Sequence, residues 1–259
     1  HLFSSAASDV YKRQVVKYAI EQPIDYLTVN TNGLRFAKDR NLLEQLSPYR
    51  DRLEVFLQFD GFEDDHYRKL RGEALLAQKL RAVDLLGEYG LNITLAVTLQ
   101  GGVNEDQIVP IVKFAQQHRH ITAINFQPAT YSGRYTIPED LERRVTFPDV
   151  IKSIANGLAG QFREEDFMPL PCAHPNCHSL TVAYRHQDQL IPVSRFFDFE
   201  SNYDLLANGI AFTRNKSRQL ITQYLTRLSR STCDQECVAP ESLPTTAQEP
   251  NWDFEEVAA

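Results

Sequence analysis

The stretch Glu54-Val-Phe-Leu-Gln-Phe-Asp60 decides the fold, because its two sides differ in chemistry. Successive side chains of a β-strand point to opposite faces, so Val55, Leu57 and Phe59 share one apolar side. Gln58 and Asp60 share the other side. We therefore predict a strand with an apolar face against the core and a polar face toward a ligand.

Three further stretches show the same division into an aliphatic face and a small, polar face: Tyr26–Asn32, Asn92–Gln100 and Ile121–Gln127. Helical patterns fill the gaps between them, which predicts parallel strands covered by helices, in an α/β fold. Parallel α/β folds bind ligands at the carboxyl ends of their strands. The polar residues near those ends are therefore predicted to line one cavity for a polar small molecule: Gln58, Asp60, Thr98, Asn125 and Gln127.

Helical spacing predicts the connecting elements. Ala74–Tyr89 repeats apolar residues at helical intervals, and Asn104 with Glu105 is predicted to cap a helix over Asp106–His118. A further helix is predicted from Phe147 to about Leu158. The stretches that follow are expected to form a hairpin: Ser179–Tyr184 and Leu190–Arg195.

Composition restricts the class of protein. The 259 residues carry a net charge of −7 without a basic run, which argues against nucleic acid or an anionic membrane as the main partner. No apolar stretch approaches the roughly 20 residues of a membrane span. No signal peptide is evident, so the expected location is cytoplasmic.

The two ends of the chain differ from the middle. Residues 1–14 show no amphipathic pattern and resemble translated sequencing-adapter sequence, so we predict a non-native scar; a natural disordered N-terminus is the alternative. Residues 15–135 are the predicted barrel region and residues 136–239 a C-terminal α+β region. Residues 240–259 are acidic and contain proline, which predicts a disordered tail.

The four cysteines form two close pairs, Cys172-x4-Cys177 and Cys233-x3-Cys237. In a cytosolic chain such pairs favour metal binding over disulfides. Four thiolates are the usual ligands of a 4Fe–4S cluster. Tetrahedral zinc is the alternative, with His174 and His178 beside the first pair, and unrelated free thiols are a third possibility.

Taken in order, several short motifs resemble those of radical S-adenosylmethionine (SAM) enzymes. They are Asn30-Thr-Asn-Gly33, Leu57-Gln-Phe-Asp-Gly61, Tyr67-Arg-Lys-Leu-Arg-Gly72, Gly102-Val-Asn104 and Asn125-Phe-Gln-Pro128. Within that superfamily, Pro171-Cys-Ala-His-Pro-Asn-Cys177 resembles the branch of archaeal tetraether lipid synthases and a pterin methyltransferase.

The resemblance implies an incomplete (β/α)6 partial TIM barrel with about four of its parallel strands present. It implies a 4Fe–4S cluster that cleaves SAM to a 5′-deoxyadenosyl radical, which modifies an unactivated C–H position by C–C coupling or methylation. Gln58 stands where the family often has serine, and is the first choice for a SAM contact. The four cysteines would hold an auxiliary cluster. A small-molecule or lipid substrate and an electron donor such as a flavodoxin or ferredoxin are the implied partners.

The family's Cys-x3-Cys-x2-Cys loop is not among these residues, so we expect an N-terminally truncated fragment that is inactive alone. Two other functions stay open. One is a barrel lyase with a structural zinc site, which a catalytic lysine on a strand would favour. The predicted helices and loops, however, hold the lysines Lys38, Lys69, Lys79 and Lys113. The other is a non-catalytic iron–sulfur protein.

Overall fold

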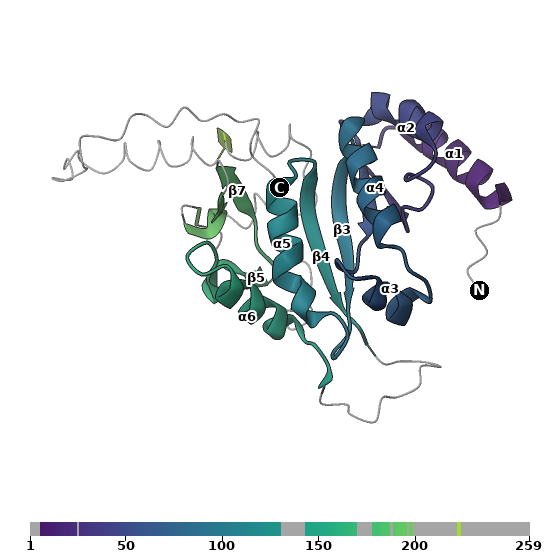
Figure 1. Ribbon diagram of the computed structural model, residues 1–259. Helices are drawn as coiled ribbons and strands as arrows, with labels where there is room; N and C mark the ends of the chain where they lie inside the picture. Colours follow the sequence, from purple (N-terminus) through teal and green to yellow (C-terminus); the bar gives the residue numbers. More distant parts are fainter. Residues whose placement is uncertain are drawn as a thin grey trace, which may run out of the picture. The chain divides into compact units, whose positions relative to one another are not determined.

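A computed structural model describes residues 6–24, 26–130, 143–169, 178–186, 189–195, 197–198 and 222–223 (Figure 1). The chain divides into two compact units, residues 1–154 and residues 155–259. Among the described residues, no helix combines the length and the hydrophobicity that crossing a membrane requires.

The first unit is built on one parallel sheet. Its four strands are β1 (Leu27–Thr31), β2 (Leu53–Gln58), β3 (Asn92–Leu99) and β4 (Ile121–Pro128). They lie in the order β1-β2-β3-β4, and every neighbouring pair is parallel. The predicted α/β fold, with about four strands of a partial barrel, is thereby confirmed, and each predicted strand is present with bounds shifted by a few residues at most.

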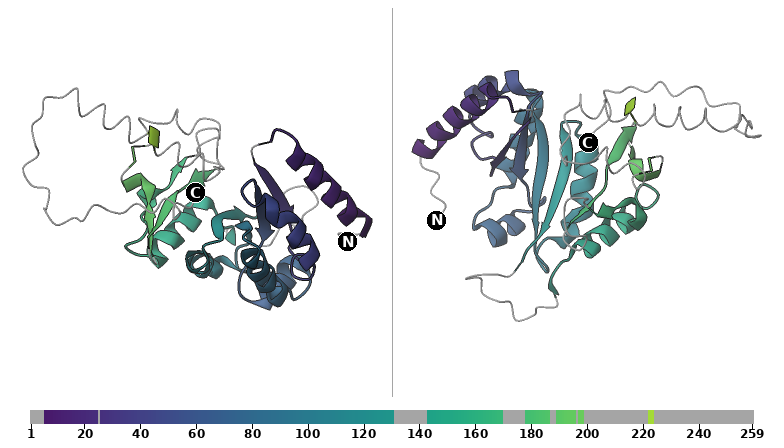
Figure 2. Two further views of the ribbon diagram at one scale, coloured as in Figure 1. Left: turned by 90° about the horizontal axis from the view of Figure 1, so that it is seen from above. Right: turned by 180° about the vertical axis from the view of Figure 1, so that it is seen from behind.

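Helices precede and connect these strands. They are α1 (Ala6–Glu21), α2 (Arg40–Leu46), η1 (Ser47–Tyr49), α3 (Asp64–Arg71), α4 (Leu76–Glu88), η2 (Glu105–Gln107) and α5 (Ile108–Gln117). Helix α4 contacts β3 and helix α5 contacts β4 (Figures 1 and 2). Helix α1 includes residues 6–14, which the sequence pattern assigned to no element; the origin of those residues stays a prediction.

The two faces of the sheet have the predicted characters. The side chains of Val55, Leu57 and Phe59 are fully buried, as are those of the corresponding positions in β3: Ile93, Leu95, Val97 and Leu99. Apolar burial of this kind is the main stabilising contribution to such a fold. On the other face Gln58 and Thr98 are half-buried, while Asn125 and Gln127 are exposed. The polar face is thus open at these four positions, whereas Glu54, Asp60, Thr94 and Ala96 on the same face are buried.

A one-residue irregularity sets the facing of β4. Ile93 pairs with Ile121 but Thr94 pairs with Ala123, so Thr122 is an extra residue. A bulge of this kind reverses the facing of every later side chain relative to the neighbouring strand. Beyond it Asn125 is level with Ala96 and Gln127 with Thr98. If Thr122 paired with Thr94 instead, the apolar residues Ile124 and Phe126 would be level with Ala96 and Thr98 on the polar face.

A buried carboxylate holds this bulge in place. The hydroxyl of Thr122 donates to Oε1 of Glu54 at 3.0 Å, and the hydroxyl of Thr94 donates to the same oxygen. Glu54 is 7% exposed. Because a buried carboxylate needs hydrogen-bond donors, Glu54 favours the register that brings both threonines to it.

The second unit contains short antiparallel pairs. Strand β5 (Met168–Pro169) pairs with β6 (Ser179–Leu180), and β7 (Ala183–His186) pairs with β8 (Gln189–Pro192). The predicted hairpin is therefore present but shorter, because Ser179 and Leu180 pair with another segment. The remaining described elements are α6 (Phe147–Gly157), which continues from the first unit, η4 (Glu164–Asp166) and η5 (Val193–Arg195).

Candidate functional site

Asp60 is the centre of a polar network at the carboxyl ends of β2 and β3. Its side chain is fully buried, and Arg71 donates to both carboxylate oxygens, from Nε at 2.8 Å and from Nη2 at 3.0 Å. The backbone N–H of Thr98 donates to Oδ1 at 3.1 Å and the amide of Gln58 to Oδ2 at 3.3 Å. Bidentate pairs with arginine are among the strongest hydrogen bonds in proteins, so this carboxylate is held rigidly.

Arg71 joins the two strands through this pair. It lies at the end of α3, yet its Nη2 also donates to the hydroxyl of Thr98 at 2.8 Å. Gly72 follows with φ of 87°, a left-handed conformation that suits glycine and ends the helix. The helix terminus thereby aims the guanidinium at the polar face of the sheet.

Lys79 approaches the same network from α4. Its Nζ donates to the backbone oxygen of Asn32 at 2.6 Å and to Oε1 of Gln58 at 3.4 Å. The Gln58 amide is therefore oriented from both ends, with its oxygen toward Lys79 and its nitrogen toward Asp60. A side-chain amide fixed in this way has one N–H and one lone pair left for a ligand.

Burial changes the titration of two groups beneath the site. Desolvation lowers the pKa of Lys79 to about 8, although the nearby Asp60 carboxylate opposes this change. Burial also raises the pKa of Tyr67 well above its usual value. The Tyr67 hydroxyl accepts the N–H of Asp60 and donates to the oxygen of Gly61 at 3.0 Å, so it braces the turn after β2.

Asn104 ties the strand ends together instead of capping a helix. Its Nδ2 donates to the backbone oxygens of Asp60 and Thr98 at 2.9 and 2.8 Å, and its Oδ1 accepts the N–H of Gln100 at 3.0 Å. The predicted capping role is wrong: the residue precedes η2 without a side-chain capping bond. A fully buried amide with three backbone partners fixes the spacing between the ends of β2 and β3.

The predicted site residues fall into two groups. Gln58, Asp60 and Thr98 share the network directly. Asn125 and Gln127 lie on the same face, one strand further along, and are exposed to solvent. The role of all five residues in binding a cofactor stays a prediction.

Sequence reasoning missed Lys79 as part of this site. A signal was present: Lys79 stands in the apolar stripe of α4, at helical spacing from Leu75, Ala82 and Leu86, and it is buried like them. A lysine in such a stripe must find a polar partner or lose its charge. Here the partners are the oxygen atoms of Asn32 and Gln58.

The predicted metal ligands Cys172, Cys177, Cys233 and Cys237 lie outside the described residues. Their convergence on one metal centre therefore stays a prediction.

Comparison with known proteins agrees with this architecture. Residues 6–115 match the family model of the radical SAM superfamily. Over 220 residues the chain is 29% identical to the 7,8-dihydro-6-hydroxymethylpterin dimethyltransferase of Methanocaldococcus jannaschii, covering 76% of this chain and 43% of that protein. Over 167 residues it is 28% identical to the GTP 3',8-cyclase of Staphylococcus aureus strain JH9, covering 64% and 44%. The chain thus spans less than half the length of these curated relatives.

The family implies SAM and a 4Fe–4S cluster as cofactors, and the polar face suits the first of these. SAM presents ribose hydroxyls, an amino group and a carboxylate. The amides of Gln58, Asn125 and Gln127 both donate and accept hydrogen bonds, as such a ligand needs. The match over residues 6–115 and the two relatives lead to one assignment: this region of the chain is similar to the radical SAM superfamily, and the donor set of the polar face agrees with that similarity.

Proposed function

We propose that the open polar face of the sheet binds SAM for radical chemistry on a substrate C–H bond. The observation that carries this proposal is the fixed amide of Gln58, which lies half-buried at the carboxyl end of β2 between Lys79 and Asp60. SAM, when bound to a reduced 4Fe–4S cluster, supplies a 5′-deoxyadenosyl radical. The residues of this chain orient the cofactor.

Each polar residue has a distinct part in this proposal. Gln58 offers its remaining N–H and lone pair to the ribose or aminoacyl group. Asn125 and Gln127, exposed on β4, contact the nucleoside. Asp60 does not bind the ligand, because its oxygens are already engaged by Arg71, Thr98 and Gln58. It positions Gln58 and the end of β3 instead.

The test is SAM binding by the purified chain, measured by equilibrium dialysis, with a matched pair of double variants. N125A/Q127A removes two exposed amides from the polar face. N41A/Q45A removes two exposed amides from α2, where Gln45 donates to Asn41 at 3.0 Å. We expect N125A/Q127A to weaken binding about tenfold, as the loss of two modest hydrogen bonds implies, and N41A/Q45A to leave it unchanged. Equal affinities for both variants would contradict the proposal.

We infer a small molecule as the substrate rather than a lipid. The two relatives are named for a pterin and for GTP, both of which contain fused nitrogen heterocycles. The exposed side chains on the polar face are amides and the hydroxyl-bearing Thr28, which also favours a polar ligand. The reaction would be C–C coupling or methylation, with electrons supplied by a flavodoxin or ferredoxin.

We propose that the four cysteines hold an auxiliary 4Fe–4S cluster. Support comes from their grouping into two close pairs in the sequence. Anaerobic reconstitution with iron and sulfide should give about four irons per chain and the absorption of a cluster. The quadruple Cys→Ser variant should give neither. Uptake of zinc alone would favour a structural zinc site.

A barrel lyase is the second candidate, and the buried Lys79 is the observation in its favour, since a pKa of about 8 suits imine chemistry. Against it, the side chain is fully buried and its ammonium is held by Asn32. Borohydride trapping with simple aldehydes and ketones would test whether Lys79 forms an imine. We expect no adduct on Lys79, whereas a Lys79 adduct would favour the lyase.

A further inference from the structure

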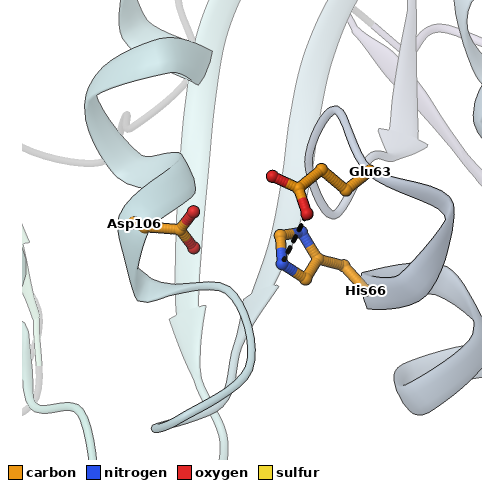
Figure 3. Close-up of side chains that lie close together, drawn as sticks. All are labelled: Glu63, His66 and Asp106. Carbon is orange, nitrogen blue, oxygen red and sulfur yellow. Dashed lines mark ion pairs between the residues drawn. The ribbon is translucent and has the colours of Figure 1, made fainter.

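A second group of polar side chains lies near the ends of β2 and β3, apart from the Asp60 network. Glu63 precedes α3, His66 lies in the first turn of α3, and Asp106 lies in η2. Because β2 and β3 are parallel neighbours, the segments that follow them meet at the same edge of the sheet. Figure 3 shows the imidazole of His66 turned toward both carboxylates.

The spacing of the three groups is close to that of a metal site. One ligand atom from each residue lies within 4.8 Å of the others. The Nε2 of His66 is 3.8 Å from Oε2 of Glu63, which is too long for a hydrogen bond. The ligands of a bound transition ion lie about 2.0–2.2 Å from the metal, so small side-chain rotations would close the site.

The imidazole of His66 gives independent support for a bound ligand, because one of its nitrogen atoms lacks a hydrogen-bond partner in the part of the chain that the structure describes. The residue is only 6% exposed, and its Nδ1 is buried without a hydrogen-bond partner among the described residues. An unpaired buried polar atom is costly, so its presence calls for a specific reason. A buried imidazole turned toward two carboxylates is placed to ligate a cation.

The surroundings order one carboxylate and leave the other free to move. Gln107, which is 5% exposed, donates from Nε2 to Oδ2 of Asp106 at 2.7 Å and accepts the N–H of Phe62 at 2.9 Å. Such outer contacts orient metal ligands in known sites. The Glu63 side chain is 59% exposed, so it can turn toward the ion.

We propose that Glu63, His66 and Asp106 bind a divalent first-row transition ion. One imidazole and two carboxylates suit Mn²⁺, Fe²⁺ or Zn²⁺, whereas Mg²⁺ and Ca²⁺ prefer oxygen ligands alone. Two carboxylate charges balance the ion. Three protein ligands leave coordination positions for water or for an anionic ligand. The site shares no ligand with the Asp60 network and does not depend on SAM binding.

Mn²⁺ titration of the intact chain, followed by electron paramagnetic resonance, tests this site. Mn²⁺ is the probe because it prefers oxygen and nitrogen ligands, so the cysteines compete poorly for it. The ligand variant is E63Q/D106N, which keeps the shapes of both side chains. The matched control is D65N/E105Q, which removes one aspartate and one glutamate from the same two segments.

We expect one saturable Mn²⁺ site in the wild type and in D65N/E105Q. Affinity should be about tenfold to a hundredfold weaker in E63Q/D106N, as the loss of metal-site groups typically causes. Pulsed measurements should show nitrogen coupling to the bound ion, and this coupling should disappear in H66Q. The absence of a saturable site, an equal loss of affinity in both double variants, or bound Mn²⁺ without nitrogen coupling would each overturn the proposal.

Discussion

The ammonium of Lys79 lies 2.6 Å from the backbone oxygen of Asn32, so a residue of helix α4 holds the turn that ends strand β1. The same ammonium reaches Oε1 of Gln58 on β2. A single buried charge thereby joins the ends of two neighbouring strands. Because the pKa of Lys79 falls to about 8 on folding, this connection depends on pH.

The stability of the wild type relative to K79M should rise in alkali. The pKa of Lys79 is about 8 in the folded chain and 10.5 when unperturbed, so between these values the unfolded state binds more protons. The free energy of unfolding then rises with pH. Relative to K79M it should rise by on the order of 3 kcal/mol between about pH 8 and pH 10.5.

Urea denaturation of both proteins at intervals from pH 7 to pH 10.5 measures this difference. Other titrating groups are common to both proteins and cancel. K79R provides a control, since its guanidinium stays charged across the whole range. A constant difference between the wild type and K79M would show that Lys79 titrates normally.

Removing the charge of Asp60 should destabilise the chain strongly. In D60N the Arg71 guanidinium loses its partner at a buried position, and breaking such a pair costs about 3–5 kcal/mol in buried sites. Arg71 keeps 29% of its side-chain exposure, so we expect the lower part of this range. D65N provides the comparison, because the exposed Asp65–Arg68 pair should contribute no more than about 1 kcal/mol.

Thermal and urea unfolding of D60N, R71M and D60N/R71M complete this test. The double variant should be more stable than the sum of the single losses predicts, since no charge is then left unpaired. Strict additivity would mean that the two side chains do not interact in solution.

Two glycines with positive φ should respond differently to alanine. A Cβ on Gly33 would lie 2.3 Å from Cδ1 of the buried Leu57, whereas one on Gly72 would meet nothing within 4 Å. Both substitutions strain the backbone, by about 1–2 kcal/mol. G33A should cost about 1–3 kcal/mol more, because it also overpacks the core. Chemical denaturation measures both, and equal losses would show that Leu57 moves aside freely.

The strands of the sheet could be predicted from the sequence, because the alternation of apolar and polar residues lies within each strand. Alternation in Glu54–Asp60 and Asn92–Gln100 indicates which apolar side chains face the core, and those side chains are fully buried. The alignment of β4 with β3 was not predictable in this way. It depends on the extra residue Thr122 and on the buried Glu54, which is distant in sequence.

The polar network was only partly predictable for the same reason. Gln58, Asp60 and Thr98 could be found from strand parity. Lys79 belongs to a helix that looks like an ordinary amphipathic element. Asn104 has the sequence position of a helix cap, but buried backbone groups at the ends of β2 and β3 compete for its amide. In each case the side chain lies where buried backbone or side-chain groups of other elements need a hydrogen-bond partner.

The central claim is that the polar face of the parallel sheet binds SAM, and residue-resolved NMR tests it most directly. Titration of the labelled chain with SAM should shift the backbone amide signals of Gln58, Thr98 and Gln127. Signals from the buried helix residues Ile111 of α5 and Val83 of α4 should stay in place. A saturable shift confined to the polar face is the predicted result. No shift at saturating SAM, or shifts confined to the helical side of the sheet, would contradict the account.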